Sequence, residues 1–161
     1  MDDVHVLTQL PLNQIHGLSQ ECYNQRVDVF ITLEARREIE ALGIVRPRRS
    51  TWGVLIGHRR GFRFVVEKVF PAGDGRSVPK EGLLAGLDGI WPGRTIGLFA
   101  VSPDASFKKA VLGPAWYGKL ILRWSGPAKA PVVRPSVVEF GRKFFLAPVP
   151  LVPAAKEKAH E

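Results

Sequence analysis

The stretch TWGVLIGHRRGFRFVVEKVF, residues 51–70, decides the fold. Its first seven residues form a continuous apolar run, which is typical of a central strand covered on both faces. The turn HRRG follows, and FRFVVEKVF then alternates in the way expected of a second strand. One side of this second strand carries Phe62, Phe64, Val66 and Phe70, and the other carries Arg63, Val65, Glu67 and Val69. The two runs therefore predict an antiparallel hairpin.

A strand and a helix are predicted before the hairpin. Residues 27–31 have the composition of a short strand, and Thr32 is placed to cap a following helix. In LEARREIEALG the apolar residues recur at i, i+4 and i+7, which is one face of a helix. Gly43 lies where such a helix would end.

The pattern alternates between helix and strand after the hairpin. Residues 79–91 have helical spacing and end at Pro92-Gly93, TIGLFAV at 95–101 is a buried strand, and 104–112 predicts a short helix. KLILRW, VVEF and KFFLAP are the later predicted strands. This order predicts an α+β fold, with a mixed sheet flanked by helices.

Length and composition indicate one domain with two terminal extensions. The 161 residues suit a single core, which we place at residues 26–147, with an N-terminal extension at 1–25 and a flexible C-terminal tail at 148–161. No apolar run approaches the roughly 20 residues that a membrane-spanning helix needs. The single cysteine, Cys22, cannot form an internal disulfide, and we therefore expect a cytoplasmic protein.

The formal net charge of +8 is unevenly distributed along the chain. Residues 1–45 carry three basic and seven acidic side chains, and residues 46–161 carry the remaining 20 basic and 8 acidic ones. A basic body attracts nucleic acid, an acidic partner or an anionic surface, and it also keeps a protein soluble. Composition alone does not choose among these.

The usual signatures of catalysis are missing. The four histidines have no spacing that would place two on one face of a helix or strand, and no serine lies in a GxSxG motif. Neither GxGxxG nor GxxxxGK[ST] occurs, so a nucleotide-binding loop is not predicted. Glu67, on a predicted strand, is more typical of a solvated strand face than of a general base.

Three segments together resemble the JAB/MPN (Mov34-type, JAMM) domain family. They are VFITLEARREIEALG, RRSTWGVLIGHRRGFRFVVEKVFPAGDG and RTIGLFAVSPDAS, and the resemblance covers about residues 28 to 125. Gly53, Gly57, Gly97 and Pro103 fall where that family has glycine and proline. The resemblance implies a layered, cytidine-deaminase-like α+β fold with a mixed sheet.

The metal-binding positions of that family are replaced in this chain. The family's glutamate base falls on Ser50, its two zinc histidines fall on Ala100 and Ser102, and its zinc aspartate falls on Gly113. Zinc lowers the pKa of its bound water only when three protein ligands hold it. The resemblance therefore implies a protein without metal, cofactor or hydrolase activity.

Two kinds of binding protein remain as expectations. Silent members of the family generally act as scaffolds, which implies a protein partner or a homo-oligomer, held either by an apolar groove around Ala100 and Val101 or by the basic hairpin. The alternative is a nucleic-acid or anion-binding module, because arginine forks suit phosphates and carboxylates. Its candidate contacts are Arg46, Arg48, Arg49, Arg59 and Arg60.

Overall fold

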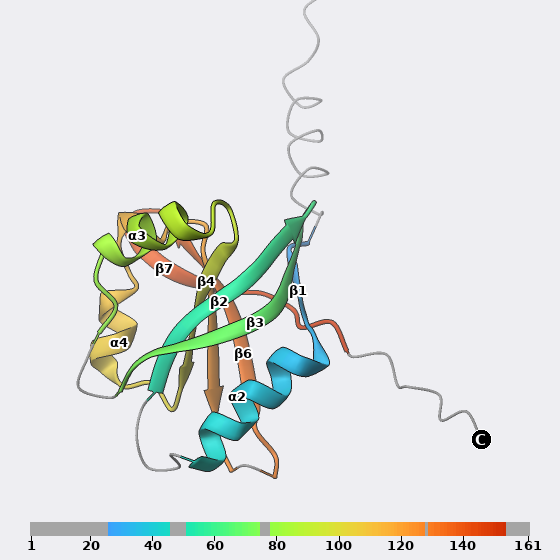
Figure 1. Cartoon of the computed structure of the whole chain (residues 1–161). Helices are drawn as coiled ribbons and strands as arrows, with labels where there is room; N and C mark the ends of the chain where they lie inside the picture. The colour runs from blue at the N-terminus through green and yellow to red at the C-terminus, as the bar shows by residue number, and fades with distance from the viewer. Residues whose placement is uncertain (1–25, 46–50, 75–77, 128, 154–161) are drawn as a thin grey trace, which may run out of the picture.

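The computed structural model describes residues 26–45, 51–74, 78–127 and 129–153 (Figure 1). The N-terminal extension at 1–25, the linker at 46–50 and residues 154–161 lie outside the described part. The strands are β1 (Asp28–Ile31), β2 (Thr51–Arg60), β3 (Arg63–Asp74), β4 (Thr95–Val101), β5 (Leu120–Ser125), β6 (Val132–Phe140) and β7 (Phe144–Pro148). The helices are α2 (Leu33–Val45), α3 (Gly82–Ile90), α4 (Ala105–Ala110) and the 3-10 turn η1 (Pro114–Trp116).

The predicted hairpin is confirmed as the antiparallel pair β2 and β3. Its turn uses Gly61 at φ 60°, a left-handed conformation that glycine adopts without a steric penalty. The predicted cap of α2 is also present, because the Thr32 hydroxyl accepts a hydrogen bond from the amide of Ala35 at 3.2 Å. Local signals in the sequence therefore predicted both the hairpin and the start of α2.

All seven strands form one mixed sheet in the order β1-β3-β2-β4-β5-β6-β7. The pairs β1–β3 and β4–β5 are parallel and the other neighbours are antiparallel. The sheet curls, and the chain after β7 returns to the free edge of β1 (Figure 1). There the amide of Val29 donates to Pro150 O at 3.0 Å, and the amide of Val152 donates to Val29 O at 2.8 Å.

This architecture corrects two expectations. The layered α+β fold of the JAB/MPN type is wrong, because the molecule is dominated by a curled mixed sheet whose first edge is covered by the C-terminal segment. The flexible tail was predicted to start too early in the chain, since Val149 is buried and Leu151 bridges to Val29.

Three β-bulges or register irregularities occur along β2, and bulges increase the local twist of a sheet.

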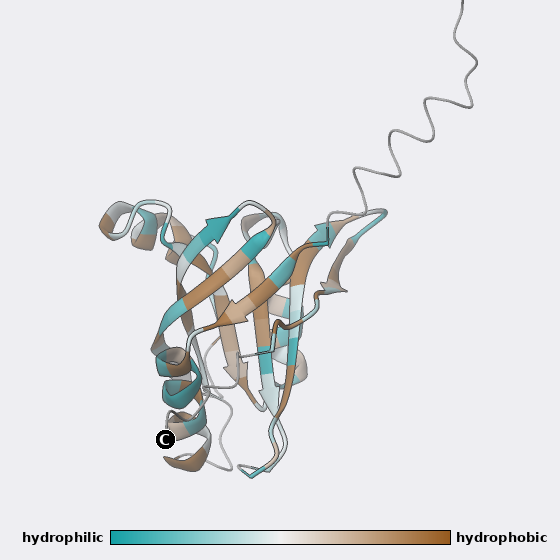
Figure 2. Cartoon of the chain, turned by 90° about the vertical axis from the view of Figure 1, so that its right-hand side faces the viewer, coloured by the Kyte–Doolittle hydropathy of each residue, from teal (hydrophilic) through white to brown (hydrophobic). Residues whose placement is uncertain are grey.

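Two apolar clusters fill the two faces of the sheet. The first lies under α2 and includes Ile39 and Phe99, and the second lies under α3 and α4 and includes Trp116. Alternate residues of one strand therefore go to opposite clusters, as the period of two requires. Figure 2 shows hydrophobic residues along the middle of the strands and hydrophilic ones toward the end of the hairpin. No helix within the described ranges is long and apolar enough to cross a membrane.

A bulge in β3 explains where the predicted alternation fails. Ile56 pairs with Lys68 and Gly57 pairs with Val66, so Glu67 is the extra residue on β3. The extra residue inverts the alternation beyond it, and Val69 is buried while Phe70 is 43% exposed. The sequence pattern had instead placed Phe70 on the side of Phe64 and Val66, and Val69 on the other side.

Candidate functional site

The residues at the family's metal positions do not form a site. Ala100 is fully buried in the second apolar cluster, together with Trp52 and Phe107. The expected partner groove around Ala100 is therefore not an accessible surface. Gly113 precedes η1, and Ser50 lies outside the described residues.

Ser102 lies beside a small cavity that opens on the other face of the sheet. Its backbone has φ 49°, and its amide donates to Trp124 O at 2.7 Å. The cavity, about 290 Å³, is lined by Ser102, Glu40 from α2 and Val101 among others. Ala100 points to the opposite face, so the structure does not bring the two histidine positions of the family together at this cavity. Within the part of the chain that is described, no cluster of three or more histidine, cysteine or acidic side chains could hold a metal ion.

The predicted basic edge is also divided by strand geometry. Arg59 and Arg60 are neighbours on β2, so their side chains leave opposite faces of the sheet. The guanidinium of Arg59 lies 4.8 Å from the centre of the Phe64 ring, a side chain of the first apolar cluster. Arg46, Arg48 and Arg49 belong to the linker that the structure does not describe.

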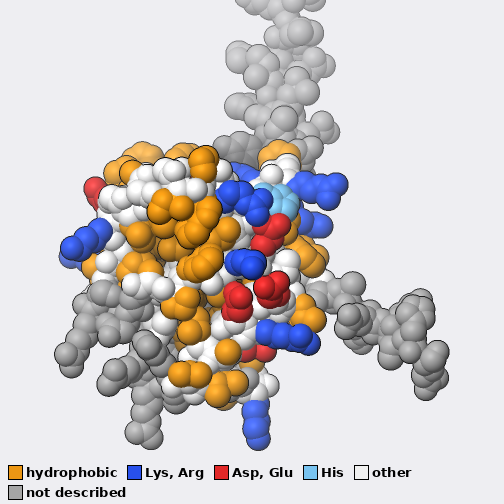
Figure 3. Space-filling view, in the orientation of Figure 1, with side chains coloured by type: hydrophobic (Ala, Val, Ile, Leu, Met, Phe, Trp, Pro, Cys, Tyr) orange, Lys and Arg blue, Asp and Glu red, His pale blue; other side chains and the backbone are white. Residues whose placement is uncertain are grey.

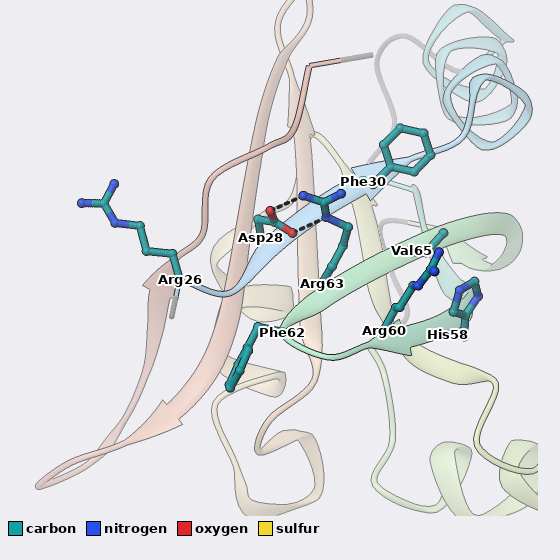
Figure 4. Close-up of a pocket in the computed structure, with 8 residues that line it drawn as sticks. All are labelled: Arg26, Asp28, Phe30, His58, Arg60, Phe62, Arg63 and Val65. Atoms are coloured by element: carbon teal, nitrogen blue, oxygen red, sulfur yellow. Dashed lines mark hydrogen bonds and ion pairs between the residues drawn. The ribbon is translucent and has the colours of Figure 1, made fainter. Parts of the chain in front are cut away.

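Arg60 instead lines a hollow on the outer face of the β1–β3–β2 corner, which we call the outer groove (Figure 4). Its volume is about 640 Å³. Alternate residues near the ends of three neighbouring strands line it, because side chains alternate along each strand, and Arg26 before β1 and Phe62 in the hairpin turn complete the lining. The lining residues are Arg26, Asp28, Phe30, His58, Arg60, Phe62, Arg63 and Val65.

The outer groove exists because the second apolar cluster covers only part of β2. Trp52, Val54 and Ile56 point to the same face as His58 and Arg60, and all three are buried in that cluster. From His58 onward β2 becomes exposed, and its side chains change from apolar to basic. Exposed charge in place of an apolar layer is what leaves this corner accessible.

A double hydrogen bond lies at the middle of the groove (Figure 4). Arg63 Nε and one terminal nitrogen each donate to one carboxylate oxygen of Asp28, both at 2.7 Å. These bonds from Arg63 hold the pKa of Asp28 below its ordinary value of 3.8, and they raise the pKa of Arg63. Both groups are therefore charged at neutral pH, and Asp28 neutralises one of the three arginines.

The other two arginines of the groove have no carboxylate partner in the described part of the chain. Arg26 and Arg60 lie on either side of the Asp28–Arg63 pair in Figure 4. With three arginines and one aspartate, the lining carries a net charge of +2 when His58 is neutral. The ring of Phe62 beside them is 48% exposed. This arrangement can bind an anion and can stack against a planar group.

A second set of charges lies next to His58. Glu67, the bulged residue of β3, accepts a hydrogen bond from Arg94, and its other oxygen lies 3.3 Å from His58 Nδ1. Arg94 is thus compensated, and His58 is held toward Glu67. Neither side chain offers the groove a free charge.

Sequence analysis missed most of this groove. Asp28 and Phe30 belong to β1, Arg26 lies two residues before Asp28, and only the parallel pairing of β1 with β3 brings this segment to the hairpin. Their separation from Arg63 along the chain, 35 residues for Asp28, leaves no periodic signal. The cluster of arginines around the turn was the one available indication, and of the predicted contacts Arg60 lines this groove.

The comparisons with known proteins bear on the fold. No family model matches this chain, and no curated protein matches it. The solution structure of protein DSY2949 from Desulfitobacterium hafniense is similar, with a TM-score of 0.55 and 20% identity over 83% of this chain and 99% of that one. At this identity the likeness shows the fold alone, and it carries no information on a JAB/MPN relationship.

Proposed function

We propose that this protein is a binding module that holds single-stranded nucleic acid by its phosphates in the outer groove. The observation that carries the proposal is the pair of arginines, Arg26 and Arg60, that lack a carboxylate partner among the described residues and line one hollow. Guanidinium groups bind phosphate oxygens through two parallel hydrogen bonds. An uncompensated pair of them favours an anionic ligand.

The exposed ring of Phe62 supports nucleic acid over a simple anion. Modules that bind single strands combine a basic groove along the backbone with aromatic rings on which bases stack. Phe62 is 48% exposed and lines the same hollow as Arg26 and Arg60. One strand could therefore place a phosphate on each arginine and a base on the ring.

The groove supports binding rather than catalysis. Its lining contains no serine, threonine, cysteine or lysine that could act as a nucleophile. Its one carboxylate, that of Asp28, is held ionised by Arg63. That the protein is not an enzyme, needs no cofactor or metal and works in the cytoplasm remain predictions of this proposal.

The test is the affinity of the full chain for a fluorescent single-stranded oligonucleotide, followed by anisotropy at several salt concentrations. We expect the affinity to fall steeply with salt, since binding releases counterions. Arg60→Glu should weaken binding by roughly tenfold or more and lower the salt slope by about one.

The neighbouring residue gives the matched control. Arg59→Glu makes the same change in net charge, but Arg59 lies on the opposite face over Phe64. It should leave the affinity within about twofold of that of the unmodified chain if the groove makes the contact. Equal losses from both variants, or no binding of any oligonucleotide at low salt, would refute the proposal.

A second candidate function, self-association, is favoured by an exposed apolar surface. The rings of Phe70 and Trp91 stack at a centroid distance of 5.3 Å, and Ile90 beside them is 65% exposed. Figure 3 shows hydrophobic side chains gathered on this face next to a band of charged ones. Exposed apolar patches of this kind mark interaction surfaces.

This second proposal is that two copies of the chain pack through the Phe70–Trp91 stack. Sedimentation velocity over a range of concentrations should detect a dimer, which the double variant Phe70→Ser, Trp91→Ser should dissociate. Phe145→Ser, at a ring that is 45% exposed on β7, is the control. A monomer at all concentrations would exclude self-association. A scaffold role shared with silent JAB/MPN members stays a prediction that rests on the sequence resemblance.

A further inference from the structure

Two arginines lie directly opposite each other on β5 and β6. Arg123 and Arg134 are register partners of this antiparallel pair, and their side chains leave the same face of the sheet. Like charges at directly opposite positions destabilise a sheet. The sequence analysis did not identify either residue.

Arg123 is only partly satisfied within the protein. One terminal nitrogen donates to the hydroxyl of Ser136 at 3.2 Å, but its Nε is buried and has no hydrogen-bond partner among the residues that the structure describes. Neither Arg123 nor Arg134 forms an ion pair with a carboxylate in the described ranges. A buried donor that is left unpaired costs free energy, and a partly buried cation costs more.

The environment of Arg123 disfavours its charge. Burial first, and then the charge of Arg134, lower its pKa from the ordinary value of an arginine. The guanidinium remains protonated at neutral pH, because even a lowered arginine pKa stays far above it. The protein therefore keeps two adjacent positive charges without an internal counterion from its described part.

Arg123 and Arg134 lie beside Ala100, the position at which the JAB/MPN resemblance implies a zinc histidine in that family. Trp52, Ala100, Arg123 and Arg134 are successive register partners across β2, β4, β5 and β6. Alternation places all four on the face of the second apolar cluster. A guanidinium next to Ala100 repels a metal cation, and it attracts an anion.

We propose that Arg123 and Arg134 together bind one phosphate group through terminal nitrogens of their two guanidinium groups, next to the buried Nε–H of Arg123. Two guanidinium groups match the two negative charges of a phosphate, and their forked donors suit its oxygens. The hydroxyl of Ser136 is close enough to Arg123 to orient it. This site is separate from the outer groove. Arg123 lies in register with Trp52 near the start of β2, through Ala100, whereas the groove is lined by His58 and Arg60 at the end of β2.

The test uses the full chain and inorganic phosphate as the probe, with sodium chloride added so that ionic strength stays constant. The Nε–Hε signals of the arginines are followed by ¹H–¹⁵N NMR during the titration. We expect saturable shifts of the Arg123 and Arg134 signals and a rise in unfolding temperature. A parallel titration with methyl phosphate distinguishes the free ion from a phosphate ester as the preferred source of the group.

Substitution of the exposed partner gives opposite signs in the two buffers. In chloride alone Arg134→Gln should raise the unfolding temperature, because it removes the repulsion between the two arginines. When phosphate is added, the variant should lack most of the rise in unfolding temperature that phosphate causes in the unmodified chain. Arg142→Gln, in the exposed turn after β6, keeps the same change in net charge and should leave the phosphate response intact. If Arg123→Gln fails to fold, Arg134→Gln still decides the question.

Two results would overturn the assignment. One is the absence of a saturable shift at Arg123 Nε–Hε. The other is a response to phosphate confined to Arg26 and Arg60, which would assign the phosphate to the outer groove instead. Loss of oligonucleotide binding in Arg60→Glu, by contrast, would leave the site at Arg123 and Arg134 untouched.

Discussion

Arg63 donates two hydrogen bonds of 2.7 Å to the two carboxylate oxygens of Asp28, its own register partner on the parallel strand β1. The pair joins the first strand of the described chain to the central hairpin. Bidentate geometry of this kind is the strong form of an arginine–carboxylate contact. It fixes the middle of the outer groove, whose two other arginines have no carboxylate partner among the described residues.

The Asp28–Arg63 pair makes stability depend on pH in the acidic range. The native pKa of Asp28 lies below its unfolded value of about 3.8, so the carboxylate stabilises the fold above pH 3.8 and loses this effect as pH falls through the native pKa. Asp28→Asn should lower the urea midpoint at neutral pH and much less below the native pKa. Asp88→Asn, at an exposed residue of α3, should show no such difference. A constant difference at all pH values would contradict the ionic origin.

Ile39 anchors α2 to the sheet. Its side chain is fully buried, whereas Ile44 on the same helix is 63% exposed. Ile39→Ala should reduce the free energy of unfolding by about 2–5 kcal/mol, because it removes buried methylenes and leaves a cavity. Ile44→Ala, with the same change in composition, should cost less than about 1 kcal/mol. Urea denaturation of both variants measures the contrast, and equal losses would mean that α2 does not pack as described.

Gly97 is required where β4 passes β5. A Cβ atom added there would lie 1.9 Å from the backbone oxygen of Leu120, too close for any side chain. Gly97→Ala should therefore destabilise the protein by about 2 kcal/mol or more, since the sheet cannot separate without losing its hydrogen bonds. Gly86→Ala is the control, because no atom lies within 4 Å of the added Cβ and alanine favours the helix by about 1 kcal/mol. Thermal unfolding should move in opposite directions for the two variants.

Asp104 caps the short helix α4. Its carboxylate accepts a hydrogen bond from the amide of Phe107 at 2.9 Å, and Phe107 is buried in the second apolar cluster. Asp104→Ala should lower the free energy of unfolding by about 1 kcal/mol, and Asp104→Asn, which keeps an acceptor, should retain most of it. If both variants lose the same amount, charge rather than the cap is responsible. Chemical denaturation at neutral pH distinguishes these outcomes.

Local patterns predicted the elements of the fold better than their arrangement. The apolar run that became β2, the spacing of α2 and the glycine turn of the hairpin act over a few residues, so they can be recognised in one sequence. The bulge at Glu67 and the return of residues 149–152 to β1 depend on contacts between distant segments. Because such contacts cannot be recognised in one sequence, a layered fold was predicted where the protein forms a curled sheet.

The candidate site was less predictable than the fold for the same reason. Arg60 could be suspected from the arginines around it. That Arg59 and Arg60 lie on opposite faces of the sheet follows only once both are known to belong to β2. Asp28 reached the groove only through parallel pairing with Arg63. At Ala100 the sequence gave no sign that Arg123 would be the neighbour across the sheet.

The hydrogen bonds between Val29 and residues 150–152 also constrain how the protein is made. During synthesis the first strand leaves the ribosome long before the segment that will cover its edge. Until that segment emerges, the backbone of β1 is open to water and to neighbouring chains, as at any unprotected sheet edge. The last residues of the described chain therefore set the earliest moment at which the fold can be completed, and a nascent chain that stops before Val149 would expose the edge of β1.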